Sequence, residues 1–152
     1  MMDINNIKKH IDLIINSDKK HNLKLREICI CLEAEVEHYN WVGFYFKNGD
    51  KEELKLSEYV GKETDHTIIP FGKGICGQVA LSNKNFVVPD VKAQDNYISC
   101  SIDVKSEIVI PIFVRGENIG QIDIDSDMIN PFTKADEDLL EYVCLQVAKI
   151  YS

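Results

Sequence analysis

The chain has 152 residues, 45% of them hydrophobic and 28% charged, and carries a formal net charge of −8. This length predicts a single domain, 1–152, with one sizeable core. The negative charge argues against nucleic acid as a partner, because phosphate backbones are bound by clustered Lys and Arg. No apolar run is long enough to span a bilayer and the N-terminus lacks the pattern of a signal peptide, so we expect no membrane partner and a cytoplasmic location.

In chain order, apolar periodicity predicts helices over 4–15 and 23–37, which form an N-terminal helical region, 1–38. Strands are predicted in the region 40–128, over 41–46, 54–59, 67–69, 85–88, 107–114 and 119–125, with a short helix over 75–81 and a loop over 91–101. A C-terminal helix in 133–152 begins with a capping box made by Thr133 and Asp136. This order predicts an α+β fold, a central antiparallel sheet with the N- and C-terminal helices packed on one face.

The five cysteines are an odd number without the spacing of a small secreted domain, which predicts free thiols rather than a disulfide framework. Cys29 and Cys31 are two positions apart on a helix and point in different directions. We expect both to be buried and inert, rather than a metal pair. The histidines of the helical regions are expected at the surface: His10, His21 and His38. No metal site is predicted.

Cys76 lies in a glycine-rich turn, Gly72-Lys-Gly-Ile-Cys76-Gly77, that leads into the short helix. Free N–H groups at a helix start favour an anion and would lower the pKa of this thiol. Alternatively, Cys76 is a small residue suited to tight packing and the glycines serve only the turn. The sequence leaves both interpretations open.

Cys100 lies in a polar loop between Ser99 and Ser101. Exposure and polar neighbours are typical of a reactive thiol. In the cytosol, a disulfide between Cys76 and Cys100 would be transient rather than structural.

Three acids lie on the last predicted hairpin. Strand alternation places Asp123 and Asp125 on one face together with Gln121, and folding about Gly116-Glu117 brings Glu107 opposite the region of Asp125. Like charges this close raise the pKa of at least one carboxyl, which leaves a proton available near neutral pH, and they also suit a substrate ammonium group. The alternative is a solvated strand end. We favour a functional cluster, because repulsion on a strand costs stability.

Several segments recur in the same order in GAF domains: Asn40-Trp41-Val-Gly-Phe-Tyr45, Gly72-Lys-Gly-Ile-Cys76-Gly77, Cys100, Ser106-Glu107-Ile-Val-Ile-Pro111, Ile119-Gly-Gln-Ile-Asp123-Ile-Asp125-Ser126 and Pro131-Phe-Thr133. More narrowly, the chain resembles the free methionine-(R)-sulfoxide reductases. The resemblance covers about residue 40 to the C-terminus. It implies a GAF-type fold and a homodimer.

The resemblance also implies a mechanism without a cofactor, in which thioredoxin or another thiol supplies the reducing equivalents. Cys100 attacks the sulfoxide sulfur of free methionine sulfoxide, releases methionine and becomes a sulfenic acid, and Cys76 resolves it as a disulfide. The acids Glu107, Asp123 and Asp125 hold the ammonium group and polarise or protonate the departing oxygen. Trp41 and Tyr45 wall the pocket around the thioether methyl group.

The chain departs from that family at two positions. The family typically has a third cysteine ten residues before Cys76, commonly the resolving partner, and His66 stands there instead. Cys76 or an external thiol would then have to resolve Cys100, and His66 could lower a thiol pKa. The residue after Cys100, usually acidic, is Ser101.

Two other functions remain as alternatives. One is a non-catalytic GAF module that binds a small amino-acid-like ligand or senses redox state through the same thiols; a free-standing domain favours the enzyme, because a sensor needs an output domain. The other is cyclic-nucleotide binding, against which the acid cluster argues, since a phosphate would meet three carboxylates.

Overall fold

The computed structural model describes residues 2–94 and 103–152. Its elements, in chain order, are α1 (Ile4–Ile15), α2 (His21–Glu35), β1 (Trp41–Lys47), β2 (Glu53–Val60), β3 (Ile68–Pro70), α3 (Gly74–Ser82), β4 (Phe86–Val88), the 3-10 turn η1 (Val91–Ala93), β5 (Ser106–Val114), β6 (Glu117–Ser126), α4 (Lys134–Ala148) and the 3-10 turn η2 (Lys149–Tyr151).

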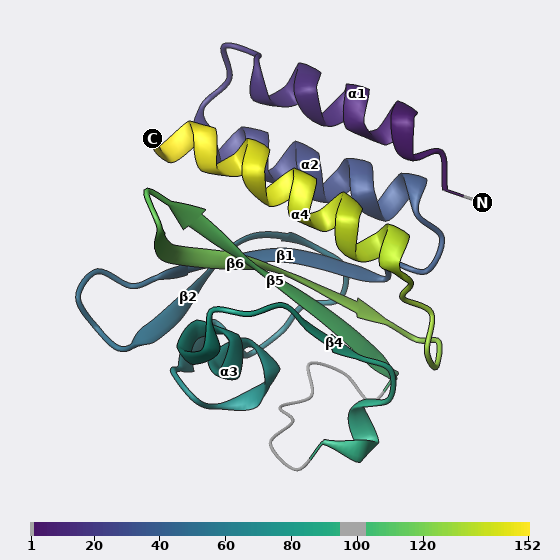
Figure 1. Ribbon diagram of the computed structural model, residues 1–152, viewed down its shortest axis with the longest axis vertical. Helices are drawn as coiled ribbons and strands as arrows, with labels where there is room; N and C mark the ends of the chain where they lie inside the picture. Colours follow the sequence, from purple (N-terminus) through teal and green to yellow (C-terminus); the bar gives the residue numbers. More distant parts are fainter. Residues whose placement is uncertain (1, 95–102) are drawn as a thin grey trace.

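The six strands form one sheet in the order β3-β2-β1-β6-β5-β4, and every neighbouring pair is antiparallel. Helices α2 and α4 cover one face of this sheet and α1 packs on them as an outer layer, whereas α3 lies on the opposite face (Figure 1). The predicted α+β fold, with the N- and C-terminal helices on one face of an antiparallel sheet, is confirmed.

The larger core lies between the sheet and the helices α1, α2 and α4. Alternate residues of the central strands point into it, among them Phe44 of β1, Ile110 of β5 and Ile124 of β6. Full burial of each such side chain stabilises the fold by about 1.5–3 kcal/mol. This core fixes the position of β6, whose other side chains face α3.

A second, smaller core lies under α3 and uses the remaining alternate positions of the same strands. It contains Trp41 and Tyr45 of β1, Val109 of β5, and Ile75 and Val79 of α3. Residues of the second core therefore alternate along the chain with residues of the first, so both layers are built on the same strands.

The ends of some elements differ from the predictions. Helix α2 ends at Glu35 rather than 37, because Val36 adopts an extended backbone and is fully buried. Strand β3 extends through Pro70. Proline has no backbone N–H to donate to a neighbouring strand, and this is tolerated here because β3 lies at the edge of the sheet. Within the predicted 91–101 loop, Val91–Ala93 form a 3-10 turn, and the loop from residue 95 to 101 lies outside the described residues.

The predictions for the helical cysteines and histidines are confirmed in part. Cys29 is fully buried as expected, but Cys31 is only half-buried. His10 and His21 are exposed as expected. His38 was wrongly expected at the surface: only 19% of its side chain is exposed, since its Nε2 lies 2.7 Å from Asp136 Oδ1 at the start of α4.

The predicted capping box at the start of α4 is confirmed. The Thr133 backbone N–H donates to Asp136 Oδ2 over 2.8 Å. In return, the Thr133 side chain accepts from the backbone N–H of Asp136, so both hydrogen bonds of the box are present. None of the helices in residues 2–94 and 103–152 is both long and apolar enough to cross a membrane.

Candidate functional site

The three acids of the predicted hairpin lie together on the face of the sheet that α3 covers. Glu107 of β5 pairs directly with Asp125 of β6, as the hairpin register predicted, and Asp123 follows on the same face. Their exposed fractions are 5% for Glu107, 1% for Asp123 and 2% for Asp125. The alternative interpretation, a solvated strand end, is therefore wrong.

Burial controls the electrostatics of these acids. Removal from water raises the pKa of the Asp123 carboxyl above its ordinary value, since desolvation disfavours the charged form. Its Oδ1 and the Gln121 Oε1 accept no hydrogen bond from the described residues. A buried acceptor without a donor costs free energy in an isolated fold. The cluster can thus keep a proton at a pH where a surface carboxyl has lost it.

Cys76 lies against this cluster in the first turn of α3. The turn before it uses glycines with positive φ, Gly72 at 89° and Gly74 at 62°, a backbone that side chains strongly disfavour. The Cys76 Sγ lies 3.8 Å from Glu107 Oε2 and donates to it. The Gln121 side-chain amide donates to the Cys76 carbonyl over 3.1 Å, which ties α3 to β6.

The suggestion that the helix start lowers the pKa of Cys76 is wrong. Burial, followed by the charges of Asp123, Glu107 and Asp125, raises this pKa well above the ordinary thiol value. The partial positive charge of one helix end is outweighed by full desolvation and by the carboxylates that face the sulfur. At neutral pH Cys76 is a thiol.

A small space lies between Cys76 and other predicted site residues. It is lined by Cys76, Glu107 and Asp123, together with Tyr45 and His66. The Tyr45 hydroxyl donates to the His66 carbonyl over 2.8 Å and so fixes this loop beside the site. The space measures about 10 Å³, which is room for about one water molecule and none for a substrate.

The adjacent cavity is larger, about 220 Å³. Below the roughly 300–1,000 Å³ of pockets for drug-sized ligands, it suits a smaller molecule. It is lined by Asn40, Trp41, Lys62, Asp103, Val104, Asp125, Ser126 and Asp127. Trp41 and Asp125 are the predicted residues on this wall, whereas Tyr45, Glu107 and Asp123 line the smaller space. The Trp41 and Tyr45 rings are stacked with centroids 6.4 Å apart, Trp41 on the larger cavity and Tyr45 on the smaller space.

The absence of a side chain at Gly43 leaves space for the Trp41 indole, which lines the larger cavity. A Cβ atom on Gly43 would lie 2.4 Å from the Trp41 ring and 2.9 Å from Tyr59 Cβ, which is closer than atoms approach. The indole therefore lies across the strand, where it stacks on Tyr59 with ring centroids 5.4 Å apart. Its Nε1 donates to the Lys62 carbonyl over 3.0 Å.

Sequence reasoning missed the charged pair at the cavity. The Lys62 ammonium forms an ion pair with Asp103, and this contact lowers the pKa of the Asp103 carboxyl. Both side chains are largely exposed. No pattern could have signalled the pair, because the two residues are 41 positions apart and lie outside the periodic segments. The cavity thus has a cation as well as the Asp125 carboxyl.

Cys100, the predicted nucleophile, lies outside the described residues. In the sequence it comes three positions before Asp103, which lines the 220 Å³ cavity. Among the described residues, Cys76, Glu107 and Asp123 offer ligand atoms within 4.8 Å of one another. These donor types also occur in metal sites, and the absence of a metal stays a prediction.

Comparisons with known proteins identify the family of this chain. The GAF domain model matches residues 21–150. A free methionine-R-sulfoxide reductase of Escherichia coli is 37% identical over 119 residues, which are 78% of this chain and 70% of that protein. GAF domain-containing protein A of Dictyostelium discoideum is 33% identical over 138 residues, 91% of this chain and 85% of that protein.

The fold also matches solved structures. The X-ray structure of free methionine-R-sulfoxide reductase from Neisseria meningitidis, in complex with its substrate, superposes with a TM-score of 0.92 and 30% identity. The match covers 97% of this chain and 87% of that one. The chain therefore belongs to the GAF-domain family and, within it, to the family of the free methionine-R-sulfoxide reductases.

Proposed function

We propose that this protein reduces free L-methionine-(R)-S-oxide to L-methionine. The observation that carries the proposal is the buried carboxyl cluster beside Cys76, next to a cavity of amino-acid size. Reduction of a sulfoxide releases its oxygen only when that oxygen is protonated, and an acid of raised pKa supplies the proton near neutral pH. The relatives named for this activity support the same substrate.

The walls of the cavity fit a zwitterionic amino acid with an apolar end. The Asp125 carboxyl can hold the substrate ammonium group and the Lys62 ammonium its carboxylate. The Trp41 indole offers an apolar surface for the thioether methyl group. We assign Tyr45 to the support of this wall, since it stacks behind Trp41 and is fully buried.

The reduction step balances with one thiolate, formed when the Cys100 thiol gives its proton to solvent, and one proton from an acid of the site. The Cys100 sulfur attacks the sulfoxide sulfur, Asp123 or a neighbouring acid protonates the oxygen, and the oxygen passes to Cys100 as a sulfenic acid while methionine leaves. The substrate sulfur gains two electrons, which Cys100 loses. This assignment makes the Asp123 carboxyl the proton source, because its raised pKa lets it keep a proton at a higher pH than a surface carboxyl.

The resolving step is assigned to Cys76. Its thiol proton passes to Glu107, the group to which it already donates, and its sulfur attacks the Cys100 sulfenic acid. A disulfide forms and water leaves. Thioredoxin or another dithiol then reduces the disulfide, so the reaction uses no cofactor. The raised pKa of Cys76 predicts that this step is slow.

A binding or redox-sensing module is the second candidate, and one observation favours it. Cys76 is buried and protonated, and His66 occupies the position where the resemblance implies a further cysteine. A chain that binds the ligand but recycles poorly would serve as such a module. We keep the cytoplasm as the proposed compartment and a homodimer as the proposed assembly.

The test is NADPH consumption in the presence of thioredoxin, thioredoxin reductase and free methionine-(R)-sulfoxide. The S epimer and a peptide-bound sulfoxide serve as matched substrates. Turnover confined to the free R form is the expected result. An inactive protein, also with dithiothreitol in place of thioredoxin, would contradict the proposal and favour the binding module.

A further inference from the structure

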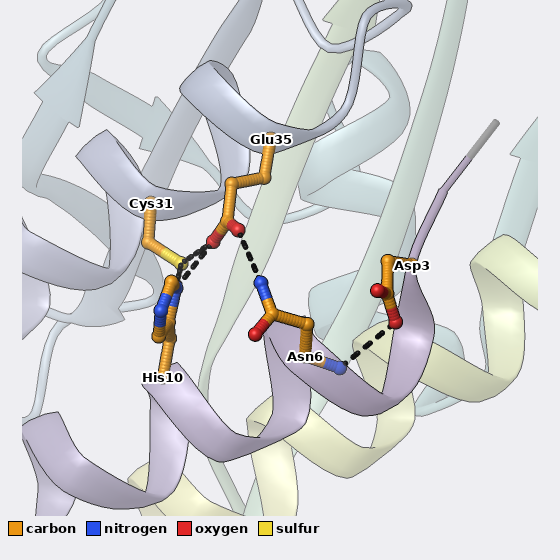
Figure 2. Close-up of polar contacts among 5 residues, drawn as sticks. All are labelled: Asp3, Asn6, His10, Cys31 and Glu35. Atoms are coloured by element: carbon orange, nitrogen blue, oxygen red, sulfur yellow. Dashed lines mark hydrogen bonds and ion pairs between the residues drawn. The ribbon is translucent and has the colours of Figure 1, made fainter.

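A second cluster of ligand-type side chains lies on the opposite side of the sheet, between α1 and α2. His10 of α1 meets Cys31 and Glu35, which are one turn apart on α2 (Figure 2). The Glu35 Oε2 lies 2.7 Å from His10 Nδ1 and accepts from Cys31 Sγ over 2.9 Å. The Cys31 sulfur and His10 Nδ1 are 4.0 Å apart.

These contacts converge on one point. A sulfur, an imidazole nitrogen and a carboxylate oxygen all face the same small volume, and the ligand atoms lie within 4.8 Å of one another. The ligand atoms of a tetrahedral zinc site lie about 3.3–3.6 Å apart, so each observed pair would have to move by roughly 0.4–0.9 Å. Side-chain rotation supplies shifts of that size, since His10 is exposed and Cys31 and Glu35 are partly exposed.

The surroundings orient the carboxylate and leave one side open. The Asn6 side-chain amide donates to the other Glu35 oxygen, Oε1, over 3.1 Å (Figure 2). Such outer contacts typically fix a metal ligand in its binding orientation. The His10 side chain is 47% exposed and that of Glu35 25%, so solvent can provide a fourth ligand.

A redox role for Cys31 is a weaker explanation of the cluster. The Cys31 thiol is only partly exposed and donates to Glu35 Oε2 over 2.9 Å, so its sulfur is held in a hydrogen bond within the cluster. The cluster therefore differs from the environment of a nucleophilic cysteine. A metal ion would take the place of the thiol proton, which is released to solvent.

We propose that His10, Cys31 and Glu35 bind a divalent transition-metal ion, with Zn²⁺ as the best fit, and that a water molecule completes the site. The mixed sulfur, nitrogen and oxygen ligands exclude Ca²⁺ and Mg²⁺, which take oxygen ligands. The ion would link α1 to α2. This site is separate from the proposed sulfoxide reduction, because it lies on the helical side of the sheet and α3 on the other (Figure 1).

The experiment uses Co²⁺ as a spectroscopic probe and Zn²⁺ as the competitor, with the full chain in its reduced form. The expected result is one equivalent of Co²⁺ with a sulfur-to-cobalt charge-transfer band that Zn²⁺ removes. Cys31→Ser should abolish this band, and Cys76→Ser should retain it. A wild-type protein without the band, or a band that survives Cys31→Ser and disappears in Cys76→Ser, would overturn the proposal.

Further variants separate ligation from damage to the fold. His10→Gln, at an exposed position, should weaken Zn²⁺ binding at least about 100-fold and Asn6→Ala about tenfold, whereas His21→Gln should leave it unchanged. Zn²⁺ should also raise the melting temperature of the wild-type protein but not that of His10→Gln, because a ligand of the native state stabilises it. Equal Zn²⁺ affinity in the wild-type protein and His10→Gln would also refute the site.

Discussion

Asp123 and Cys76 are both ionisable, and burial acts on both in the same direction. Each has its pKa raised by desolvation, so each keeps its proton at a higher pH than it would at the surface. For Asp123 this provides a proton donor. For Cys76 it makes the thiolate scarce, so the proposed resolving step needs an acceptor for the thiol proton, and Glu107 is the group to which this thiol donates.

The first prediction concerns the nucleophile. Cys100→Ser should abolish sulfoxide reduction, a loss of at least about 1,000-fold, because a serine hydroxyl is a poor nucleophile toward sulfur and forms no sulfenic acid. The measurement is single-turnover release of methionine. Cys144→Ala, a change in the larger core, is the control and should keep its activity. Full activity in Cys100→Ser would show that another thiol attacks.

The second prediction concerns His66, which lines the small space together with Cys76. His66→Cys should speed thioredoxin-dependent turnover several-fold, because it adds a thiol where the family resemblance implies a resolving cysteine. Steady-state NADPH consumption measures the effect, and the His66→Ser variant controls for the loss of the imidazole. An unchanged or reduced rate would mean that Cys76 already acts as the resolving cysteine, or that the geometry forbids a disulfide between Cys100 and the cysteine introduced by His66→Cys.

The third prediction concerns the pH dependence of stability. Because the pKa of Asp123 is raised, the native state holds a proton that the unfolded chain has lost, from about the ordinary Asp pKa upward. The free energy of unfolding therefore falls as pH rises through that window, by up to about 1.4 kcal/mol per pH unit. Asp123→Asn removes this proton uptake, so the variant should gain stability relative to wild type as pH rises.

Urea unfolding at several pH values from about 4 to 8 measures this difference. Asp50→Asn, in an exposed turn, is the control and should follow the wild-type curve. Parallel curves for wild type and Asp123→Asn would show that Asp123 titrates normally in the native state.

The sequence predicted which acids meet, but not what burial does to their neighbour. Strand alternation and hairpin register are local rules, and they placed Glu107 opposite Asp125 correctly. The pKa of Cys76 depends on how completely α3 seals the sulfur from water, which is a property of the packed structure. The helix-end argument from sequence therefore predicted the wrong direction.

At the scale of elements, one carboxylate joins α4 to the segment after α2. Asp136 caps α4 through Thr133, accepts from the Tyr39 hydroxyl over 2.8 Å and contacts His38. Burial, followed by the nearby Asp136 charge, raises the pKa of the Tyr39 hydroxyl, so Tyr39 acts here as a hydrogen-bond donor. The sequence predicted the cap from the Thr133 and Asp136 spacing, but not these long-range partners, which lie 97 and 98 positions away.

The fourth prediction follows from these contacts of Asp136. Asp136→Ala should lower the free energy of unfolding by about 2–4 kcal/mol, because it removes the cap and leaves the buried Tyr39 hydroxyl without its acceptor. Urea denaturation measures the loss. Asp138→Ala, two positions later in an exposed ion pair with Lys134, should cost less than about 0.5 kcal/mol. A similar small cost for Asp136→Ala would show that the contacts of Asp136 contribute little to the free energy of unfolding.

At the scale of the whole molecule, the sequence predicted how the helices and the sheet are layered, but it did not predict that the site consists of two spaces. Amphipathic periodicity identified the helices and strands, so the covered face of the sheet could be predicted. The sequence did not show that Trp41 and Tyr45 line two different spaces, because that depends on the missing side chain at Gly43. The domain limits stay a prediction.

The fifth prediction concerns the assembly. Large apolar side chains are exposed on the outer helices, Leu13 of α1 by 71% and Leu145 of α4 by 65%. If the homodimer forms through the terminal helices, Leu145→Asp should shift the sedimentation coefficient from dimer to monomer. Leu81→Asp, on α3 at the opposite face, should leave it unchanged. A monomeric wild-type protein would contradict the predicted dimer.

The alternation along β6 has a consequence for how such proteins diverge. Ile122 and Ile124 pack against the helices, while Asp123 and Asp125, which alternate with them, face the site. A core substitution that displaces the strand by a fraction of an ångström must displace the acids as well, because one backbone carries both sets. We therefore expect a substitution in the helical layer of this protein to change its ligand affinity even when every residue that contacts the ligand is kept.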